Sequence, residues 1–122
     1  MDASLEERQS YSARLMIKHP DRIPVIIENN LKLDNYKYLL PKSLLFSEFL
    51  VIIRKKITLN KFEAIYSFVK NENEYILVPM RESIGELYNR YKNLDNFFYI
   101  RFGIENTFGW SFAKGSFWLN VK

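Results

Sequence analysis

Apolar residues recur at helical spacing in three stretches of the chain, and each stretch has a recognisable start. Ser4-Leu5-Glu6-Glu7 and Ser83-Ile84-Gly85-Glu86 both have the spacing of a capping box, in which a serine and a glutamate satisfy free N–H groups at the start of a helix. Ser43 can cap the remaining stretch, whose last turn carries Arg54-Lys55-Lys56 opposite the helix dipole. The pattern predicts helices from Leu5 to the residues before Pro20, from Leu44 to about Ile57, and from Ile84 to Tyr91.

Four shorter runs are rich in β-branched and aromatic residues, which is typical of strands. They cover residues 22–28, 36–40, 64–69 and 97–102. Asn29-Asn30 ends the first run and Pro41 ends the second, and together these two runs predict a hairpin. The polar segment 70–74 has the composition of a loop.

The resulting order is helix, strand, strand, helix, strand, helix, strand. A hairpin followed by a long helix that crosses to further strands is the β-grasp arrangement of ubiquitin. We therefore expect an α+β fold with a mixed four-stranded sheet, two packing helices and an extra N-terminal helix. The first and last strands would lie side by side.

Composition narrows the functional classes. With 122 residues, 48% of them hydrophobic, the chain can bury one core, so we expect a single domain. Lysine and arginine exceed aspartate and glutamate by 18 − 14 = 4, which predicts a mildly basic surface for acidic partners or anionic membrane faces. The excess is too small to indicate nucleic-acid binding, and no RNA-binding signature is present, so we expect no nucleic-acid partner. The absence of cysteine excludes disulfides, thiolate metal sites and a cysteine nucleophile, and it fits a reducing, cytosolic setting.

Targeting signals and catalytic patterns are both missing. The polar, acidic segment Met1–Arg8 differs from a secretory signal, and no apolar run approaches the roughly 18 residues that span a bilayer. His19 is the only histidine, and the carboxylates show no paired arrangement of the kind found in acid–base sites. We therefore do not expect an enzyme, a catalytic residue, a cofactor or a metal.

Five separated motifs are more specific than composition. In chain order they are Pro20-Asp21-Arg22-Ile23-Pro24-Val25-Ile26, Lys37-Tyr38-Leu39-Leu40-Pro41, Ile53-Arg54-Lys55-Lys56-Ile57, Phe68-Val69 and Glu105-Asn106-Thr107-Phe108-Gly109. Their order and phase resemble those of the autophagy ubiquitin-like modifiers, the family that includes autophagy-related protein eight of yeast, the GABA-receptor-associated proteins and the microtubule-associated protein light chain three group. The resemblance runs from about Leu5 to Gly109.

That resemblance implies a modifier rather than an enzyme. Residues 1–109 would form the ubiquitin-like domain, and a cysteine protease would remove the tail, residues 110–122. Activating and conjugating enzymes would then join Gly109 to phosphatidylethanolamine; a glycine has no Cβ and can enter a narrow tunnel. Because about two acyl chains give stable anchoring, the product would move from the cytoplasm to autophagosome or vacuole-type membranes.

The resemblance also implies capture of cargo receptors. Their peptides carry an aromatic residue, two spacers and an aliphatic residue, and they add to the edge of the sheet. An aromatic pocket would be lined by Leu15, Pro24, Ile26, Lys37, Leu39 and Phe97. An aliphatic pocket would be lined by Tyr38, Leu40, Pro41, Leu44, Phe49 and Ile52. A basic rim of Arg22, Lys55 and Lys56 would attract acidic residues of the peptides.

The residues themselves agree with an edge strand, since the run at 38–40 is short and is followed by Pro41. Side-chain alternation would separate Tyr38 and Leu40 from Lys37 and Leu39. Core packing is the other explanation for most of these apolar residues, and we expect Phe49 and Ile52 to be partly buried.

The tail leaves a second function open. Residues 110–122 are longer and more apolar than the few residues that family members usually discard, so the alternative is a β-grasp interaction module that keeps its tail and is not lipidated. Trp118 and Val121 have the aromatic-x-x-aliphatic spacing themselves. They predict tail-mediated self-association through the groove of a neighbouring molecule, with a disordered tail as the competing interpretation.

Overall fold

A computed structural model describes residues 3–28, 36–57 and 63–106 of the chain. Gly109, Trp118 and Val121 lie outside the described residues, as does the rest of the predicted tail. Three helices and five strands follow in the order α1 (Leu5–Lys18), β1 (Arg22–Ile27), β2 (Lys37–Pro41), α2 (Phe46–Lys56), β3 (Glu63–Asn71), β4 (Glu74–Leu77), α3 (Ile84–Tyr91) and β5 (Phe98–Asn106). Within the described residues, no helix has the length and apolar character needed to cross a bilayer.

The strands form one mixed sheet in the order β2-β1-β5-β3-β4. β1 and β2 are antiparallel, which confirms the predicted hairpin, and β1 pairs in parallel with β5, which confirms that the first and last strands are neighbours. The prediction of four strands was wrong, because β4 adds a fifth strand antiparallel to β3. The segment 70–74, expected to be a loop, contains the end of β3, a two-residue turn and the start of β4.

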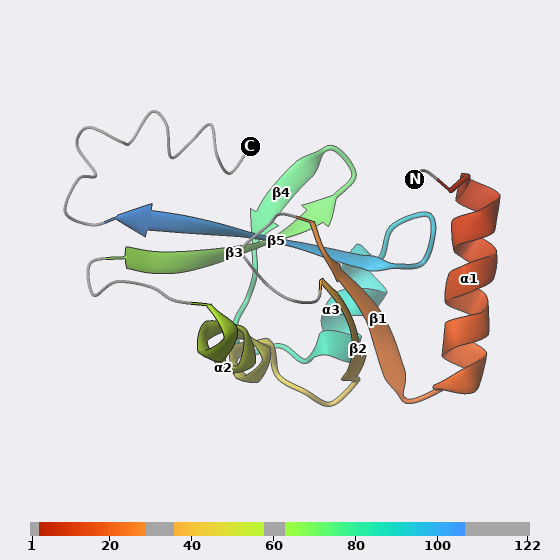
Figure 1. Ribbon diagram of the computed structural model, residues 1–122, viewed down its shortest axis with the longest axis horizontal. Coiled ribbons are helices and arrows are strands. Elements are labelled where there is room, and N and C mark those ends of the chain that lie inside the picture. Colours follow the sequence, from red (N-terminus) through yellow and green to blue (C-terminus); the bar gives the residue numbers. More distant parts are fainter. Residues whose placement is uncertain (1–2, 29–35, 58–62, 107–122) are drawn as a thin grey trace.

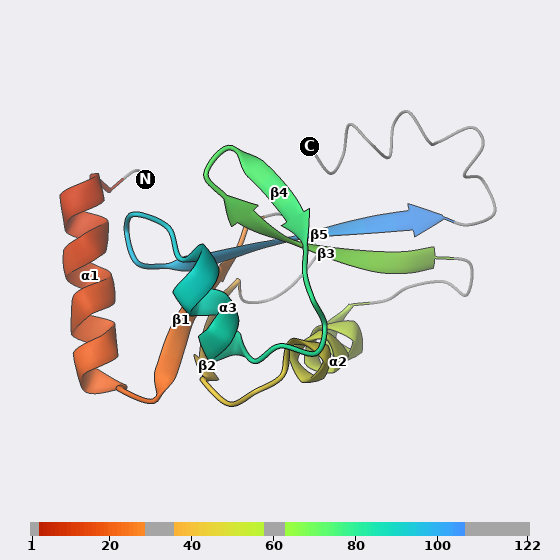
Figure 2. The ribbon, with the colours of Figure 1, turned by 180° about the vertical axis from the view of Figure 1, so that it is seen from behind.

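The core lies between the sheet and the two helices α2 and α3, which cover the same face of it (Figures 1 and 2). Alternate residues of the central strands point into this core, among them Ile23 and Val25 of β1 and Phe98 and Ile100 of β5. Each such side chain contributes about 1.5–3 kcal/mol when it is removed from water. This burial fixes which residues of β1 and β2 face away from the core.

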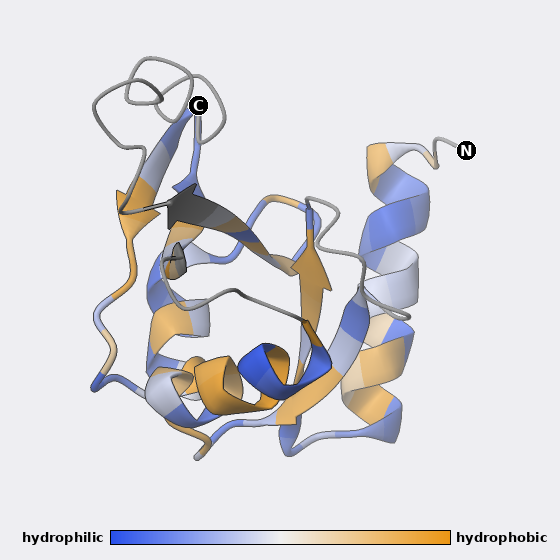
Figure 3. Cartoon of the chain, turned by 60° about the vertical axis from the view of Figure 1, so that its left-hand side comes forward, coloured by the Kyte–Doolittle hydropathy of each residue, from blue (hydrophilic) through white to orange (hydrophobic). Residues whose placement is uncertain are grey.

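Helix α1 lies outside this core, beside β1 (Figures 1 and 2). Its apolar residues lie mainly in its C-terminal turns, and hydrophilic residues occupy most of the rest (Figure 3). Ser12 is its only buried residue. Polar contacts must therefore help to hold α1 in place.

The ends of the helices only partly follow the sequence pattern. The capping boxes predicted at Ser4 and Ser83 are both present. The N-cap predicted at Ser43 was wrong: α2 begins at Phe46, and the Glu48 carboxylate accepts a hydrogen bond from the Leu45 N–H at 2.9 Å. The N–H groups of the next two residues donate to carbonyls of Glu82 and Met80, so partners distant in sequence satisfy the start of this helix.

Candidate functional site

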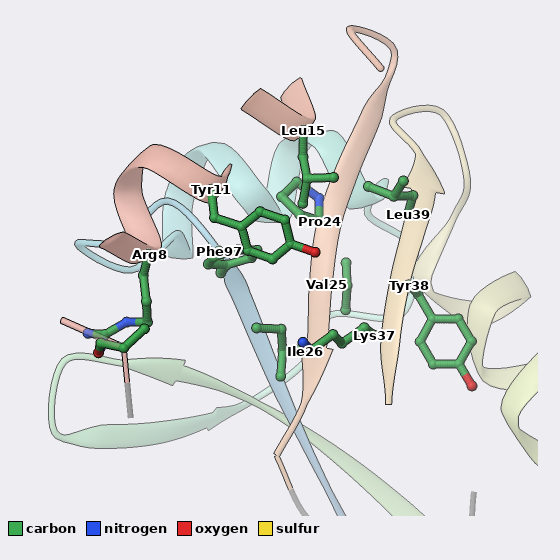
Figure 4. Close-up of a pocket in the computed structure, with 11 residues that line it drawn as sticks. Arg8, Tyr11, Leu15, Pro24, Val25, Ile26, Lys37, Tyr38, Leu39 and Phe97 are labelled. Atoms are coloured by element: carbon green, nitrogen blue, oxygen red, sulfur yellow. The ribbon is translucent and has the colours of Figure 1, made fainter. Parts of the chain in front are cut away.

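An apolar pocket of about 630 Å³ lies between α1, the hairpin β1–β2 and the residue that precedes β5 (Figure 4). Its floor comes from residues of β1 and β2, and α1 supplies one wall. The lining residues are Ala3, Arg8, Tyr11, Leu15, Pro24, Val25, Ile26, Lys37, Tyr38, Leu39 and Phe97. We call this the α1 pocket.

The six residues predicted to line an aromatic pocket all line the α1 pocket. Pro24 and Ile26 alternate with the core residues of β1, so both face the side on which α1 lies. Phe97 forms another wall, and its ring centroid is 5.9 Å from that of Tyr11. An opening with two aromatic walls and an aliphatic floor suits a flat apolar side chain.

The sequence did not assign five of the lining residues to this pocket: Ala3, Arg8, Tyr11, Val25 and Tyr38, the last of which was assigned to the aliphatic pocket. Tyr11 and Ser12 are neighbours in the stretch that predicts the first helix. The structure separates their roles, since Ser12 is buried and Tyr11 is exposed at the pocket. The sequence does hold one indication that Arg8 lines the pocket. It stands three and four positions before Tyr11 and Ser12, and residues at that spacing lie on the same side of a helix.

The charge of the α1 pocket is positive. Among the described residues that line it, Arg8 and Lys37 carry charge, and both are cations. Arg22, Lys55 and Lys56, predicted to form a basic rim, do not line it: all three are exposed, Arg22 at the start of β1 and the two lysines in the last turn of α2. The pocket itself therefore favours an apolar group, and of its two cations Arg8 is already paired with Asp95.

β2 is an edge strand whose free side borders the pocket. The Ile27 N–H donates to the Tyr36 carbonyl, and the Lys42 N–H donates to the Asp21 carbonyl. In an antiparallel pair such bonded positions alternate, so the backbone groups of Lys37 and Leu39 point away from β1. Pro41, which has no N–H, shares this outward position, as expected for an edge strand.

The residues predicted to line an aliphatic pocket lie on the α2 side of β2. Tyr38 points away from the α1 pocket toward α2 (Figure 4), and its ring centroid lies 5.6 Å from that of Phe49. Phe49 is 0% exposed, so the expectation of partial burial was wrong for this residue; Ile52, at 40%, is exposed. Leu40 is also buried, and Pro41 and Leu44 are half-buried. Tyr38, Pro41, Leu44 and Ile52 are thus the members of this set that reach the surface.

Asp95 connects α1 to the start of β5. Its carboxylate, 3% exposed, accepts hydrogen bonds from Arg8 Nε at 3.0 Å, from the Phe97 N–H at 3.0 Å and from the Tyr99 hydroxyl. The Ser12 hydroxyl donates to the Asp95 carbonyl at 2.7 Å. Arg8 and Phe97, which both line the α1 pocket, are therefore fixed by one side chain.

The same cluster affects a tyrosine. Burial, followed by the hydrogen bond to Asp95, raises the pKa of Tyr99 above its ordinary value. The hydroxyl therefore remains a donor to Asp95 throughout the physiological range of pH.

Comparison with known proteins decides the family. The family model described as "Autophagy protein Atg8 ubiquitin like" matches residues 7–109. The chain belongs to the Atg8 family. It is 42% identical over 110 residues to autophagy-related protein 8d of Arabidopsis thaliana, and the matched region covers 86% of this chain and 88% of that protein. It is 40% identical over 113 residues to autophagy-related protein 8 of Schizosaccharomyces pombe, which covers 88% of this chain and 90% of that protein.

Solved Atg8 structures share the fold. The crystal structure of Trypanosoma brucei ATG8 superposes with a TM-score of 0.70 at 32% identity and covers 89% of this chain and 95% of that one. Plasmodium falciparum Atg8, solved in complex with a Plasmodium falciparum Atg3 peptide, superposes with a TM-score of 0.67 at 29% identity and covers 82% and 89%. The recognition made from the five motifs is confirmed, and the protein is a ubiquitin-like modifier of the autophagy system with a β-grasp fold.

Proposed function

We propose that this Atg8-family protein is conjugated through Gly109 to phosphatidylethanolamine and recruits cargo receptors through the α1 pocket and the free edge of β2. The observation that carries the receptor part is the position of the pocket, which opens beside the outward backbone groups of Lys37 and Leu39. A peptide strand that pairs with this edge would hold one of its side chains over the pocket.

The aromatic residue of the peptide would enter the α1 pocket. An aromatic side chain buries about 150–250 Å², so its transfer from water favours binding by several kcal/mol before the costs of association. Three residues further along, the aliphatic residue would lie over the surface formed by Tyr38, Leu44 and Ile52. The buried side chains of Leu40 and Phe49 would support that surface from the core.

Arg22 lies where the peptide backbone would pair with β2. Its Nη1 donates to the Leu39 carbonyl at 3.3 Å, and that carbonyl is one of the groups that an added strand would use. A bound peptide must share or displace this hydrogen bond. We propose that Arg22, together with Lys55 and Lys56, then interacts with acidic side chains of the peptide, each exposed pair contributing about 0–1 kcal/mol.

The conjugation part of the proposal rests on family membership and on the sequence at Gly109. A processing cysteine protease would remove residues 110–122, after which activating and conjugating enzymes would transfer Gly109 to the lipid. The peptide complex of Plasmodium falciparum Atg8 with Atg3 supports a conjugating enzyme as a partner. The protein would then be cytoplasmic before lipidation and bound to autophagosome or vacuole-type membranes after it. It would perform no catalysis itself.

An unprocessed chain is the second candidate. Because residues 110–122 carry Trp118 and Val121 at the spacing of a receptor motif, the precursor would place this motif in the groove of a neighbouring molecule. Truncation at Gly109 should then raise the affinity for a receptor peptide. Equal affinities and equal monomer fractions for the two forms would exclude self-association through the tail.

The receptor site is tested by Leu39→Arg, which places a charged side chain at the floor of the α1 pocket. Leu77→Arg is the matched control, because Leu77 is 59% exposed on β4, the other edge strand of the sheet. Calorimetric titration with a peptide that contains tryptophan, two alanines and valine should show binding at least about tenfold weaker for Leu39→Arg, because the loss of an aromatic anchor costs more than 1.4 kcal/mol. The control should bind as the wild type does, and equal affinities for all three proteins would contradict the proposal.

A further inference from the structure

β4 leaves one edge of the sheet open. It is the last strand in the order β2-β1-β5-β3-β4, so one of its sides pairs with β3 and the other borders no strand of the described sheet (Figures 1 and 2). An open edge presents unpaired N–H and C=O groups that can pair with another strand. β2, which borders the proposed receptor groove, is the opposite edge, so the open side of β4 is a separate surface.

The backbone of two residues points outward at this edge. The Val78 N–H donates to the Ser67 carbonyl at 3.0 Å, so the backbone of Val78 faces β3. Bonded positions alternate along an antiparallel pair, and the backbone of Ile76 therefore also faces β3. Tyr75 and Leu77 present their N–H and C=O groups to the open side.

The side chains of the same two residues lie on the face of the sheet away from the core. This follows from Ile76, which stands between them and lies opposite the buried Val69. Leu77 is 59% exposed. The Tyr75 hydroxyl donates to a Glu28 oxygen at 2.9 Å, which holds its ring in place. The edge thus carries an exposed leucine two residues from a fixed aromatic ring.

We propose that β4 pairs with β4 of a second copy of this chain, antiparallel about a two-fold axis at Ile76. Tyr75 of each copy would lie opposite Leu77 of the other, which gives four backbone hydrogen bonds and two contacts between leucine and an aromatic ring. An axis at Leu77 would instead place Tyr75 opposite Pro79, which has no N–H. An axis at Tyr75 would place Leu77 opposite Asn73, which lies in the turn. The axis at Ile76 therefore uses every outward group of both strands.

The charges at the two ends of β4 are complementary in the same arrangement. Glu72 and Glu74 lie at its start, and Arg81 lies in the segment that follows it. All three residues are exposed, and none of them forms an ion pair within the part of the chain that the structure describes. A two-fold axis brings the acidic end of each β4 beside the basic segment of the other copy. The edge carries its own complement, which is the reason for naming a second copy as its occupant.

The pair is small, because each β4 has four residues. Interfaces that bury less than about 1,200 Å² are typical of weak, transient complexes, so we expect the dimer to form at protein concentrations on the order of 0.1–1 mM. Each pair occupies both open β4 edges, and a two-fold contact of this kind closes on itself. The assembly therefore stops at a dimer.

Sedimentation equilibrium of the full chain up to about 1 mM should show an average mass that rises from the monomer toward the dimer and no further. Over the same range the amide resonances of Tyr75 and Leu77 should shift more than that of Ile76, which faces β3. Leu77→Pro should remain a monomer, because it removes an outward N–H group and leaves the bonds to β3 in place. Leu39→Pro, which makes the same change on the edge strand β2, is the matched control and should dimerise as the wild type does.

An exchange of charges tests the arrangement without changing the backbone. Arg81→Glu alone, and Glu72→Lys with Glu74→Lys alone, should each dimerise at least about tenfold more weakly, because like charges then meet at the ends of β4. An equimolar mixture of these two proteins should dimerise as the wild type does. Both keep a net positive charge, since the chain has a net charge of +4 and the substitutions change it by −2 and +4, so general attraction does not explain the recovery. Lys18→Glu, at an exposed position on α1, should dimerise normally alone and should not restore the lysine variant to the wild-type level.

Several results would overturn this inference and leave the receptor proposal intact. They are a monomer at every concentration, a dimer that persists in Leu77→Pro and in Arg81→Glu, and a mixture of the charge variants that stays monomeric. Association that is lost on truncation at Gly109 would be assigned to the tail in the receptor groove, and would also overturn it. So would a monomer whose Tyr75 and Leu77 amides shift only when a receptor peptide is added, because the edge would then bind a peptide strand.

Discussion

At the scale of single residues, Asp95 holds together the parts of the molecule that form the α1 pocket. Its carboxylate accepts hydrogen bonds from α1, from the backbone before β5 and from Tyr99. The sequence marks this role weakly, since an aspartate in a polar loop is usually exposed. Only the tertiary fold places Arg8 beside it, 87 positions away in the chain.

Asp95→Ala should lower the free energy of unfolding by about 2–3 kcal/mol, because it leaves the Phe97 N–H and the Tyr99 hydroxyl without an acceptor. Denaturant unfolding measures this directly. Asp21→Ala, at an exposed position, is the control and should change stability by no more than about 0.5 kcal/mol. Equal stabilities for the two variants would show that the Asp95 cluster does not hold α1 in place.

Tyr99 predicts a dependence of stability on alkaline pH. Its pKa is raised in the folded protein, chiefly by burial, so its contribution is complete below the ordinary tyrosine value of about 10 and is lost as pH rises toward the folded pKa. In urea unfolding, the stability difference between the wild type and Tyr99→Phe should therefore shrink between about pH 9 and pH 11. A constant difference over that range would contradict the assigned cause.

At the scale of elements, β4 shows where the pattern of residues was insufficient. The strand has four residues, and polar side chains surround its turn, so composition favoured a loop. Its pairing with β3 is nevertheless regular from Phe68 opposite Leu77 to Asn71 opposite Glu74. A short edge strand is defined by the neighbour that it pairs with, which the local sequence does not reveal.

The turn between β3 and β4 is strained at Glu72, whose φ is 58°. A positive φ at only the first of the two central residues is the pattern of a type II′ turn, which prefers glycine at that position. Glu72→Gly should therefore raise the free energy of unfolding by about 0.5–1 kcal/mol. Glu74→Gly, within β4, should lower it by a similar amount. Chemical denaturation that shows both variants to be destabilised would exclude this turn geometry.

The start of α2 was misplaced for a related reason. Ser43 is a good N-cap by residue type, but segment 80–82 supplies the carbonyls that bind the first N–H groups of α2. Gly85 allows α3 to lie close to Lys42, because a Cβ at position 85 would be 3.2 Å from the Lys42 Cβ and from the Lys42 carbonyl oxygen. Local patterns found the helix, and contacts between distant segments set its first residue.

At the scale of the whole molecule, the sequence was most informative where a motif spans several elements. The residues expected in an aromatic pocket were transferred from the family pattern, and all six line the α1 pocket. A second pocket, beside the turn between β3 and β4, could not be anticipated in this way, because its lining residues Arg8, Lys70 and Lys92 are far apart in sequence and form no motif. The complete burial of Phe49 could not be predicted either, because an apolar stripe on a helix can face the core or a binding partner.

The central claim is that this Atg8-family protein acts as a lipid-conjugated modifier, and the mass of the protein after reconstituted conjugation tests it most directly. The full chain would be incubated with an Atg8-processing protease, the activating and conjugating enzymes, ATP and vesicles that contain phosphatidylethanolamine. We predict a product that ends at Gly109 and carries one phosphatidylethanolamine in amide linkage, and no such product from Gly109→Ala, because the added Cβ obstructs the narrow enzyme sites. Recovery of the intact 122-residue chain without lipid, under conditions that conjugate the Schizosaccharomyces pombe relative, would contradict the account and favour an unprocessed interaction module.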